Sequence, residues 1–123
     1  MNDQRDYALK AIRPVLLLEG GAAGEEEVFK NEVLRPILKL QNDVIVAMAE
    51  KCRDQYDPDL DLRAVLRDRA LRDQLLGVVV GLFTLEELAF YLSHQRALDR
   101  RIMGMLMQRL EDQLGYVSPD TVA

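Results

Sequence analysis

Apolar residues recur every three or four positions between residues 33 and 48, and this spacing constrains the fold more than any other feature. Residues at such intervals share one face of an α-helix, whereas alternation at every second residue is typical of a strand. One stripe at this spacing consists of Val33, Ile37, Leu40, Val44 and Ala47. Further apolar residues flank this stripe, so more than half of the helix circumference is apolar. The pattern predicts a helix that must be covered on more than one side.

Helical spacing continues along most of the chain, with glycine and proline as interruptions. The one β-branched run, Val78–Val80, lies between two glycines inside a helical pattern, so it does not indicate a strand. We therefore predict an all-α fold, a small bundle of about five helices that is kinked at proline and has no sheet. The expected helices span residues 3–18, 25–55, 60–83, 84–93 and 95–114, and the third of them consists of the segments 60–69 and 70–83, either as one bent helix or as two.

Three local signals support these boundaries. Pro14 is expected to kink or divide the first helix, and Pro36 either interrupts the second or occupies its first turn. The fourth helix begins with the sequence Thr84-Leu85-Glu86-Glu87, which matches a capping box. In this motif the threonine oxygen accepts a backbone hydrogen bond from Glu87, whose carboxylate accepts one from the backbone of the threonine.

The length and charge of the chain bound its class. With 123 residues we expect one helical domain, in which residues 1–24 form an N-terminal helix and a Gly-rich linker and residues 115–123 a flexible tail. A net charge of −5 makes nucleic acid and anionic membranes poor partners. The longest apolar run, 75–83, falls short of the roughly 20 residues that span a bilayer. Without a signal-peptide pattern at the start, we expect a cytoplasmic protein that does not associate with membranes.

The sequence offers few groups for catalysis or metal binding. Cys52 is the only cysteine and His94 the only histidine, whereas zinc sites need three or four protein ligands. The two could be imagined as a nucleophile and a base, but Cys52 lies at ordinary core spacing from Met48. Phosphate-binding glycine motifs and the nucleophile-elbow motif are missing from the sequence. We expect no catalytic residues, no metal and no cofactor.

The segment from residue 84 to residue 102 has the outline of a helix-turn-helix. Its second helix carries Arg96, Arg100 and Arg101, which could reach phosphates or bases if they formed one exposed basic face. Asp99 opposes this interpretation, because a core residue is usual at its position. A DNA-binding regulator is therefore kept only as an alternative hypothesis.

Gln41 falls within the apolar face of the second helix. A buried amide needs hydrogen-bond partners, so this residue is either a structural hydrogen-bonding group or a ligand contact. With Arg35 and Lys39 nearby on the same helix, it defines a second alternative, a helical bundle that binds a small molecule. Such a site would need a cavity into which these polar groups converge.

The last expected helix is also apolar over a wide arc. Two such helices are difficult to enclose within one short chain, and an exposed apolar patch of that size is unusual in monomers. We therefore expect a homodimer or a larger homo-oligomer, joined chiefly through the second and last helices. The candidate interface residues are Met103, Met107 and Leu114. The leading functional hypothesis is a helical interaction and oligomerisation module without catalytic activity of its own.

Three segments resemble a small family of uncharacterised bacterial helical proteins. They are Asn31–Asp43, Gly81–Glu87 and Ala97–Met103, and Lys30 departs from the Phe-Gln-Asn pattern that often enters the first of them. The resemblance implies a helical architecture. Some members of the family are called glyoxalases, yet glyoxalase chemistry needs a metal held by several His, Glu or Asp side chains on a strand-rich scaffold. Because this chain has one histidine and predicts no strand, we expect no such metal site.

Overall fold

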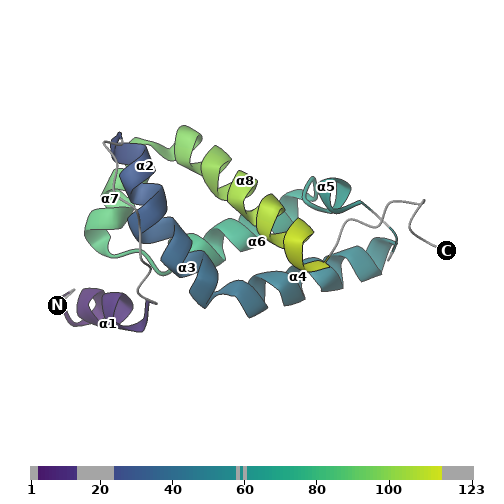
Figure 1. Ribbon diagram of the computed structural model, residues 1–123, viewed down its shortest axis with the longest axis horizontal. Coiled ribbons are helices and arrows are strands. Elements are labelled where there is room, and N and C mark those ends of the chain that lie inside the picture. Colours follow the sequence, from purple (N-terminus) through teal and green to yellow (C-terminus); the bar gives the residue numbers. More distant parts are fainter. Residues whose placement is uncertain (1–2, 14–23, 58, 60, 115–123) are drawn as a thin grey trace.

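The computed structural model describes residues 3–13, 24–57, 59 and 61–114. Within these residues every regular element is helical, which confirms the predicted all-α fold (Figure 1). The elements in chain order are α1 (Asp3–Ile12), α2 (Glu25–Phe29), the π-helical turn η1 (Lys30–Leu34), α3 (Arg35–Leu40), α4 (Asn42–Tyr56), α5 (Leu62–Val65), α6 (Arg69–Val80), α7 (Leu85–Ser93) and α8 (Gln95–Leu114). None of the described helices has the length and apolarity needed to cross a membrane.

Elements α2, η1 and α3 follow one another without a break and form one arm of the molecule, the α2–α3 arm (Figure 1). Proline has no N–H to continue an α-helical ladder, and the chain responds by widening to π-helical bonding just before Pro36. The backbone N–H of Arg35 accordingly bonds the carbonyl of Lys30, five residues back. The predicted interruption at Pro36 is thus a change of helix type inside a continuous helix. Pro14, the expected linker before Gly24 and the expected tail lie outside the described residues.

Two of the expected long helices are each divided. The helix expected over 25–55 turns at Gln41, whose φ of −92° and ψ of 9° are not helical, and α4 then begins. The segments 60–69 and 70–83, expected either as separate helices or as one bent helix, are separate, because Asp68 caps a new helix. Its carboxylate accepts a hydrogen bond from the backbone N–H of Leu71 at 2.9 Å. An N-cap carboxylate satisfies an orphan donor and so favours a new helix start.

The core lies along one face of α8, which runs diagonally across the molecule from the α7 end toward α4 (Figure 1). Four side chains spaced four residues apart on this face are fully buried: Leu98, Ile102, Leu106 and Leu110. They pack with buried residues of the α2–α3 arm, α4, α5 and α6. At one end an aromatic cluster extends the core, with the ring of Phe29 stacked on Phe90 at 4.9 Å and edge-on to Phe83 at 5.4 Å.

Tyr91 of α7 links this cluster to α8. Its ring meets Phe83 edge-on at 5.5 Å, and its hydroxyl donates to the carboxylate of Asp99. Burial, together with this hydrogen bond, raises the pKa of Tyr91 to about 12. Asp99 stands where a helix-turn-helix would place a core residue, and here it serves as a hydrogen-bond acceptor between α7 and α8.

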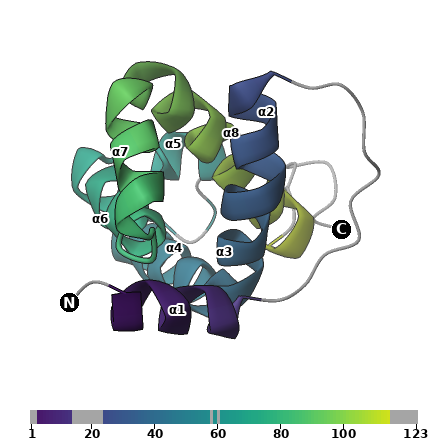
Figure 2. The ribbon, with the colours of Figure 1, turned by 90° about the vertical axis from the view of Figure 1, so that its left-hand side faces the viewer.

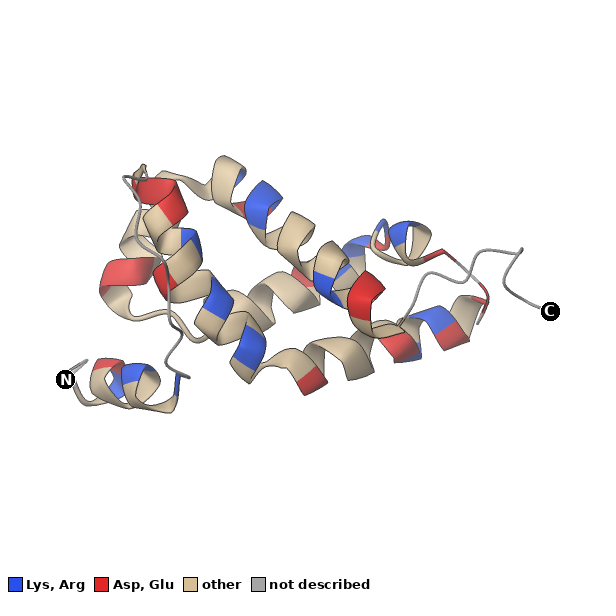
Figure 3. Ribbon diagram, viewed as in Figure 1, with Lys and Arg blue, Asp and Glu red and all other residues tan. Residues whose placement is uncertain are grey.

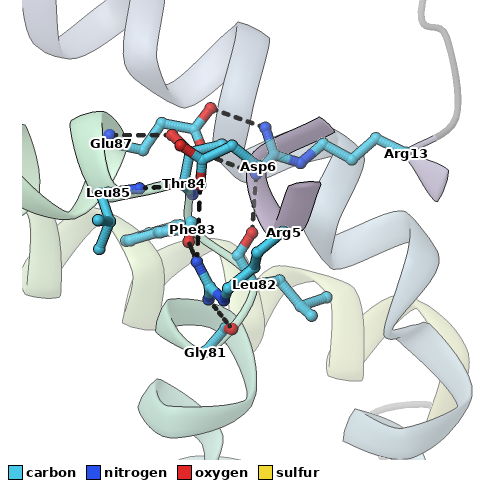
Figure 4. A network of polar contacts seen from close by, with 9 residues as sticks. All are labelled: Arg5, Asp6, Arg13, Gly81, Leu82, Phe83, Thr84, Leu85 and Glu87. Carbon is cyan, nitrogen blue, oxygen red and sulfur yellow. Dashed lines mark hydrogen bonds and ion pairs between the residues drawn. The ribbon is translucent and has the colours of Figure 1, made fainter. Parts of the chain in front are cut away.

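The predicted capping box at the start of α7 is confirmed. The hydroxyl of Thr84 accepts from the backbone N–H of Glu87 at 3.2 Å, and the carboxylate of Glu87 accepts from the backbone N–H of Thr84 at 2.9 Å. The same carboxylate also binds α1. Nη1 and Nη2 of Arg13, the residue directly after Ile12 that is counted with α1 from here on, donate to it at 2.7 and 2.6 Å. This gives a bidentate ion pair between α1 and α7 (Figure 4).

Helix α1 lies at the edge of the bundle and is held there mainly by polar contacts (Figures 2 and 4). Leu9 is its one buried apolar side chain. The segment 81–84, which we call the α6–α7 turn, presents three backbone carbonyls to α1. Arg5 donates to the carbonyls of Phe83 and Gly81 at 2.9 and 3.0 Å, and Arg13 donates to that of Leu82 at 2.8 Å.

The ion pair between Arg13 and Glu87 is the best-shielded part of this contact, since the two side chains are only 8% and 13% exposed. Burial by itself would raise the pKa of Glu87. The hydrogen bonds from Arg13 and from the Thr84 backbone outweigh that effect and hold the pKa below its ordinary value of 4.5. The carboxylate is therefore stabilised in its charged form, and α1 docking depends on that charge.

Glu87→Gln should release α1 without removing the capping box, because glutamine also serves at this position of the motif. Losing a shielded, bidentate, charge-assisted pair costs more than about 1.4 kcal/mol, so amide hydrogen exchange in α1 should accelerate at least about tenfold. Exchange in α8 should change far less. Glu86→Gln is the matched control, because Glu86 is an exposed neighbour in the same helical turn. Equal protection of α1 in both variants would contradict the assignment.

Acid should release α1 in the same way. Because the folded-state pKa of Glu87 is lowered, the ion pair contributes its full stabilisation above the ordinary value of 4.5, and that contribution is lost as pH falls through the lowered value. Hydrogen exchange or NMR shifts of α1, followed from neutral to acidic pH, should report this transition. The transition should be largely absent from Glu87→Gln, which has no carboxylate to titrate at this position.

Candidate functional site

A groove of about 640 Å³ lies between the α2–α3 arm and α8. We call it the basic groove, because four of its ten lining residues are basic and one is acidic, in a chain whose net charge is −5. Lys and Arg positions are visible on both the arm and α8 in Figure 3. The lining residues are Lys30, Arg35, Leu38, Arg101, Gly104, Met105, Gln108, Arg109, Asp112 and Gln113.

Helical periodicity builds the α8 wall of the groove. Between Arg101 and Gln113 each lining residue of α8 has another one three or four positions away, so they share one face of the helix. This face lies beside the row that is buried in the core, which fixes its direction. The opposite wall comes from η1 and α3, where Lys30 and Arg35 lie on the same arm as the core residue Leu38.

At the α2 end of the groove the positive charge is partly neutralised. Nη1 of Arg101 donates to Oε2 of Glu27 at 2.6 Å, and Nζ of Lys30 lies 3.7 Å from the other carboxylate oxygen. Glu26 also lies within 3.7 Å of Arg101. The hydrogen bond from Arg101, and then the charge of Lys30, lower the pKa of Glu27. These carboxylates close this end to further anions.

At the other end two basic side chains have no carboxylate paired with them among the described residues. Arg109 donates to Oδ1 of Asn42 at 3.0 Å, a neutral acceptor that also receives a hydrogen bond from Gln113 at 2.5 Å. Arg35 is exposed. Among the residues that the structure describes, neither Arg35 nor Arg109 forms an ion pair. Both are therefore available to an anion that enters the groove.

Gly104 leaves space in the α8 wall. A glycine inside a helix costs roughly 0.5–1 kcal/mol relative to alanine, so its presence in a helix of 20 residues calls for a reason. Its position is exposed, and a methyl group there would meet no atom within 4 Å. The missing side chain thus widens the groove and is not needed for helix packing.

One of the three predicted ligand residues lies in this groove. Arg35 lines it, whereas Lys39 is exposed and lies outside its lining. Gln41 instead donates from Nε2 to the carbonyl of Val78, at 3.3 Å, near the end of α6. That carbonyl lies in the last turn of α6, where helical acceptors lack an intrahelical partner, so Gln41 has the structural role that was one of its two expected roles.

The candidate interface residues Met103, Met107 and Leu114 are partly buried and pack against the core of their own chain. Their role in an oligomer stays a prediction. The apolar side chains most exposed in the single chain belong to other segments: Tyr7 and Ile12 of α1, Val28 of α2, Leu40 of α3, Val44 and Tyr56 of α4, and Leu85 and Leu92 of α7.

The imagined pair of Cys52 and His94 is not brought together. His94 stacks on Phe90 at the turn between α7 and α8, at the opposite end of the long axis from the C-terminal half of α4, where Cys52 lies (Figure 1). Burial, followed by the charge of Asp68, raises the pKa of the Cys52 thiol. Within the described part of the chain, no three His, Cys, Asp or Glu side chains form a group that could hold a metal ion.

Sequence reasoning did not single out Lys30 and Arg109 as groove residues. It assigned Arg101 only to the DNA-binding alternative. The periodicity of α8 gave a signal for one polar face, but it did not say which helix that face would meet. Protein-family models, curated proteins and solved structures give no match to this chain. The resemblance to the small bacterial helical family therefore stays an expectation.

Gly104→Ala should stabilise the protein by about 0.5–1 kcal/mol in urea unfolding, because alanine favours the helix and fits without a clash. It should also narrow the basic groove. Gly77→Ala is the matched control, since Gly77 is exposed in the interior of α6, has equal free space and lies outside the groove. Destabilisation by Gly104→Ala alone would show that Gly104 serves packing and not the groove.

Proposed function

We propose that this protein is a binding module that takes a small anionic ligand, bearing carboxylate or phosphate groups, in the basic groove. The observation that carries the proposal is the presence of Arg35 and Arg109, without ion-pair partners among the described residues, in one groove of an acidic protein. Guanidinium groups bind carboxylate and phosphate through two parallel hydrogen bonds. The groove volume of about 640 Å³ is also in the usual range for small-molecule sites.

The charge pattern favours a small anion over a nucleic acid. Glu26 and Glu27 lie at one end of the basic groove and Asp112 at the other, so a phosphate backbone running beyond the groove would meet carboxylates. The regulator hypothesis needs Arg96, Arg100 and Arg101 on one free basic face. Arg96 and Arg100 are exposed, but Arg101 is occupied by two glutamates, so this hypothesis has less support. The apolar floor at Leu38 and Met105 suits a ligand with a short carbon skeleton.

Binding of citrate and pyrophosphate, used as probes, should be weakened at least about tenfold by Arg35→Gln combined with Arg109→Gln, because both uncompensated charges are removed. NMR titration of labelled protein at low salt measures both the affinity and the residues that respond. Added salt should reduce binding, as expected for a partly exposed ionic site.

The matched control is Arg67→Gln combined with Arg72→Gln, which removes the same charge from exposed positions outside the basic groove. An equal loss of affinity in both double variants would mean that the probes respond only to overall charge. Gly104→Ala should weaken binding while raising stability, a combination that partial unfolding cannot produce.

A further inference from the structure

The α6–α7 turn forms a receptor for guanidinium groups. Three consecutive carbonyls, those of Gly81, Leu82 and Phe83, accept hydrogen bonds from arginine side chains at 2.8–3.0 Å. The carboxylate of Glu87 lies beside them. Carbonyls just past a helix C-terminus carry partial negative charge, and the carboxylate adds a full charge. Arg5 and Arg13 occupy this receptor. The contact therefore consists mainly of directed hydrogen bonds from side-chain groups, as in ligand binding, and not of apolar packing.

Apart from these bonds, α1 is tied to its own bundle by a hydrogen bond from the backbone N–H of Leu85 to Asp6 at 3.3 Å and by one buried side chain. Leu9 is buried, whereas Tyr7 is 78% and Ile12 is 53% exposed. Ala8 and Ala11 are exposed as well, so an apolar strip of α1 faces away from the bundle. A helix of ten residues is marginal by itself in water, and its order therefore depends on docking. Any copy of α1 with the same arginines can supply that docking.

The connection between α1 and the rest of the chain is long enough for docking on a neighbour. Ten residues, 14–23, separate Arg13 from Gly24. A chain of this length reaches up to about 35 Å when extended. A second copy of the chain has both sides of the contact, namely Arg5 and Arg13 on one side and the receptor on the α6–α7 turn on the other. Reciprocal exchange then satisfies both receptors and closes under two-fold symmetry.

We infer that the α6–α7 turn accepts α1 from a second copy, so that two chains exchange their first helices and form a dimer. The exposed strip of Tyr7, Ala8, Ala11 and Ile12 then lies between the two protomers, where it can be covered. This inference concerns a surface apart from the basic groove and does not depend on the proposed ligand. In this dimer the expected homo-oligomer is joined through α1 and the α6–α7 turn, whereas the sequence predicted an interface at Met103 and Met107 of α8.

Two complementary full-length variants test the exchange. Arg13→Glu and Glu87→Arg each place like charges at the contact within one chain, so each variant alone should lose α1 docking. Mixed together, they can dock only across chains. One dock of the exchanged dimer then carries the native pair and the other carries the reversed pair. Because neither variant can dock α1 within its own chain, any protection of α1 in the mixture reports docking between chains.

Native mass spectrometry of the two variants, one of them isotopically labelled, should show a one-to-one heterodimer formed at least about tenfold more readily than either homodimer. Hydrogen exchange should show α1 protected again in the mixture. The control is a single chain with both substitutions, in which the reversed pair can form internally. Two separate monomers with unprotected α1 in the mixture would overturn the inference, whatever the control shows, because the native pair is still available to one dock.

Discussion

The row of fully buried side chains on α8 is the interaction on which the rest of the structure depends. Leu98, Ile102, Leu106 and Leu110 are wholly enclosed, and burial of each contributes about 1.5–3 kcal/mol relative to exposure. Neighbouring segments pack on this row from several sides. It fixes not only the core but also the direction of the adjacent face of α8, and so holds Arg101 and Arg109 opposite the α2–α3 arm.

A second kind of interaction joins α1 to this core. Helix α6 ends near glycine, and the chain then turns with several carbonyls that no helix can satisfy. Side chains from elsewhere satisfy them, Gln41 at Val78 and two arginines at the turn itself. Such contacts are directional and charge-dependent, whereas the contacts around α8 are apolar and extensive. Helix α1 can therefore leave its dock while the core stays intact, and α8 cannot.

The capping box at Thr84 and the extent of the last helix, from Gln95 to Leu114, were predicted from the sequence, because each rests on residues within a few positions of one another. The sequence divides the region 60–83 at residues 69 and 70, but it leaves open whether one bent helix results and does not single out Asp68 as a cap. An aspartate inside a helical pattern gives the same local signal whether it lies on a solvated face or caps a new helix, and the choice here also involves the hydroxyl of Tyr56, which donates to Asp68 at 2.7 Å from another helix. For Gln41, periodicity predicted a position within the apolar face of its helix, whereas its hydrogen-bond partner, the carbonyl of Val78, is set by how two helices pack.

By itself the sequence determined what depends on neighbours along the chain: helical periodicity, the absence of strand-like alternation, an irregularity at Pro36 and the cap at Thr84. Only the tertiary structure decided which polar faces meet. The pairs Arg13–Glu87 and Arg101–Glu27 are each separated by 74 positions, and Arg109 meets Asn42 across 67. Such contacts follow from how buried apolar rows bring helices together, and periodicity specifies the face that is buried without specifying the helix that covers it. The basic groove and the α1 dock are both products of that packing.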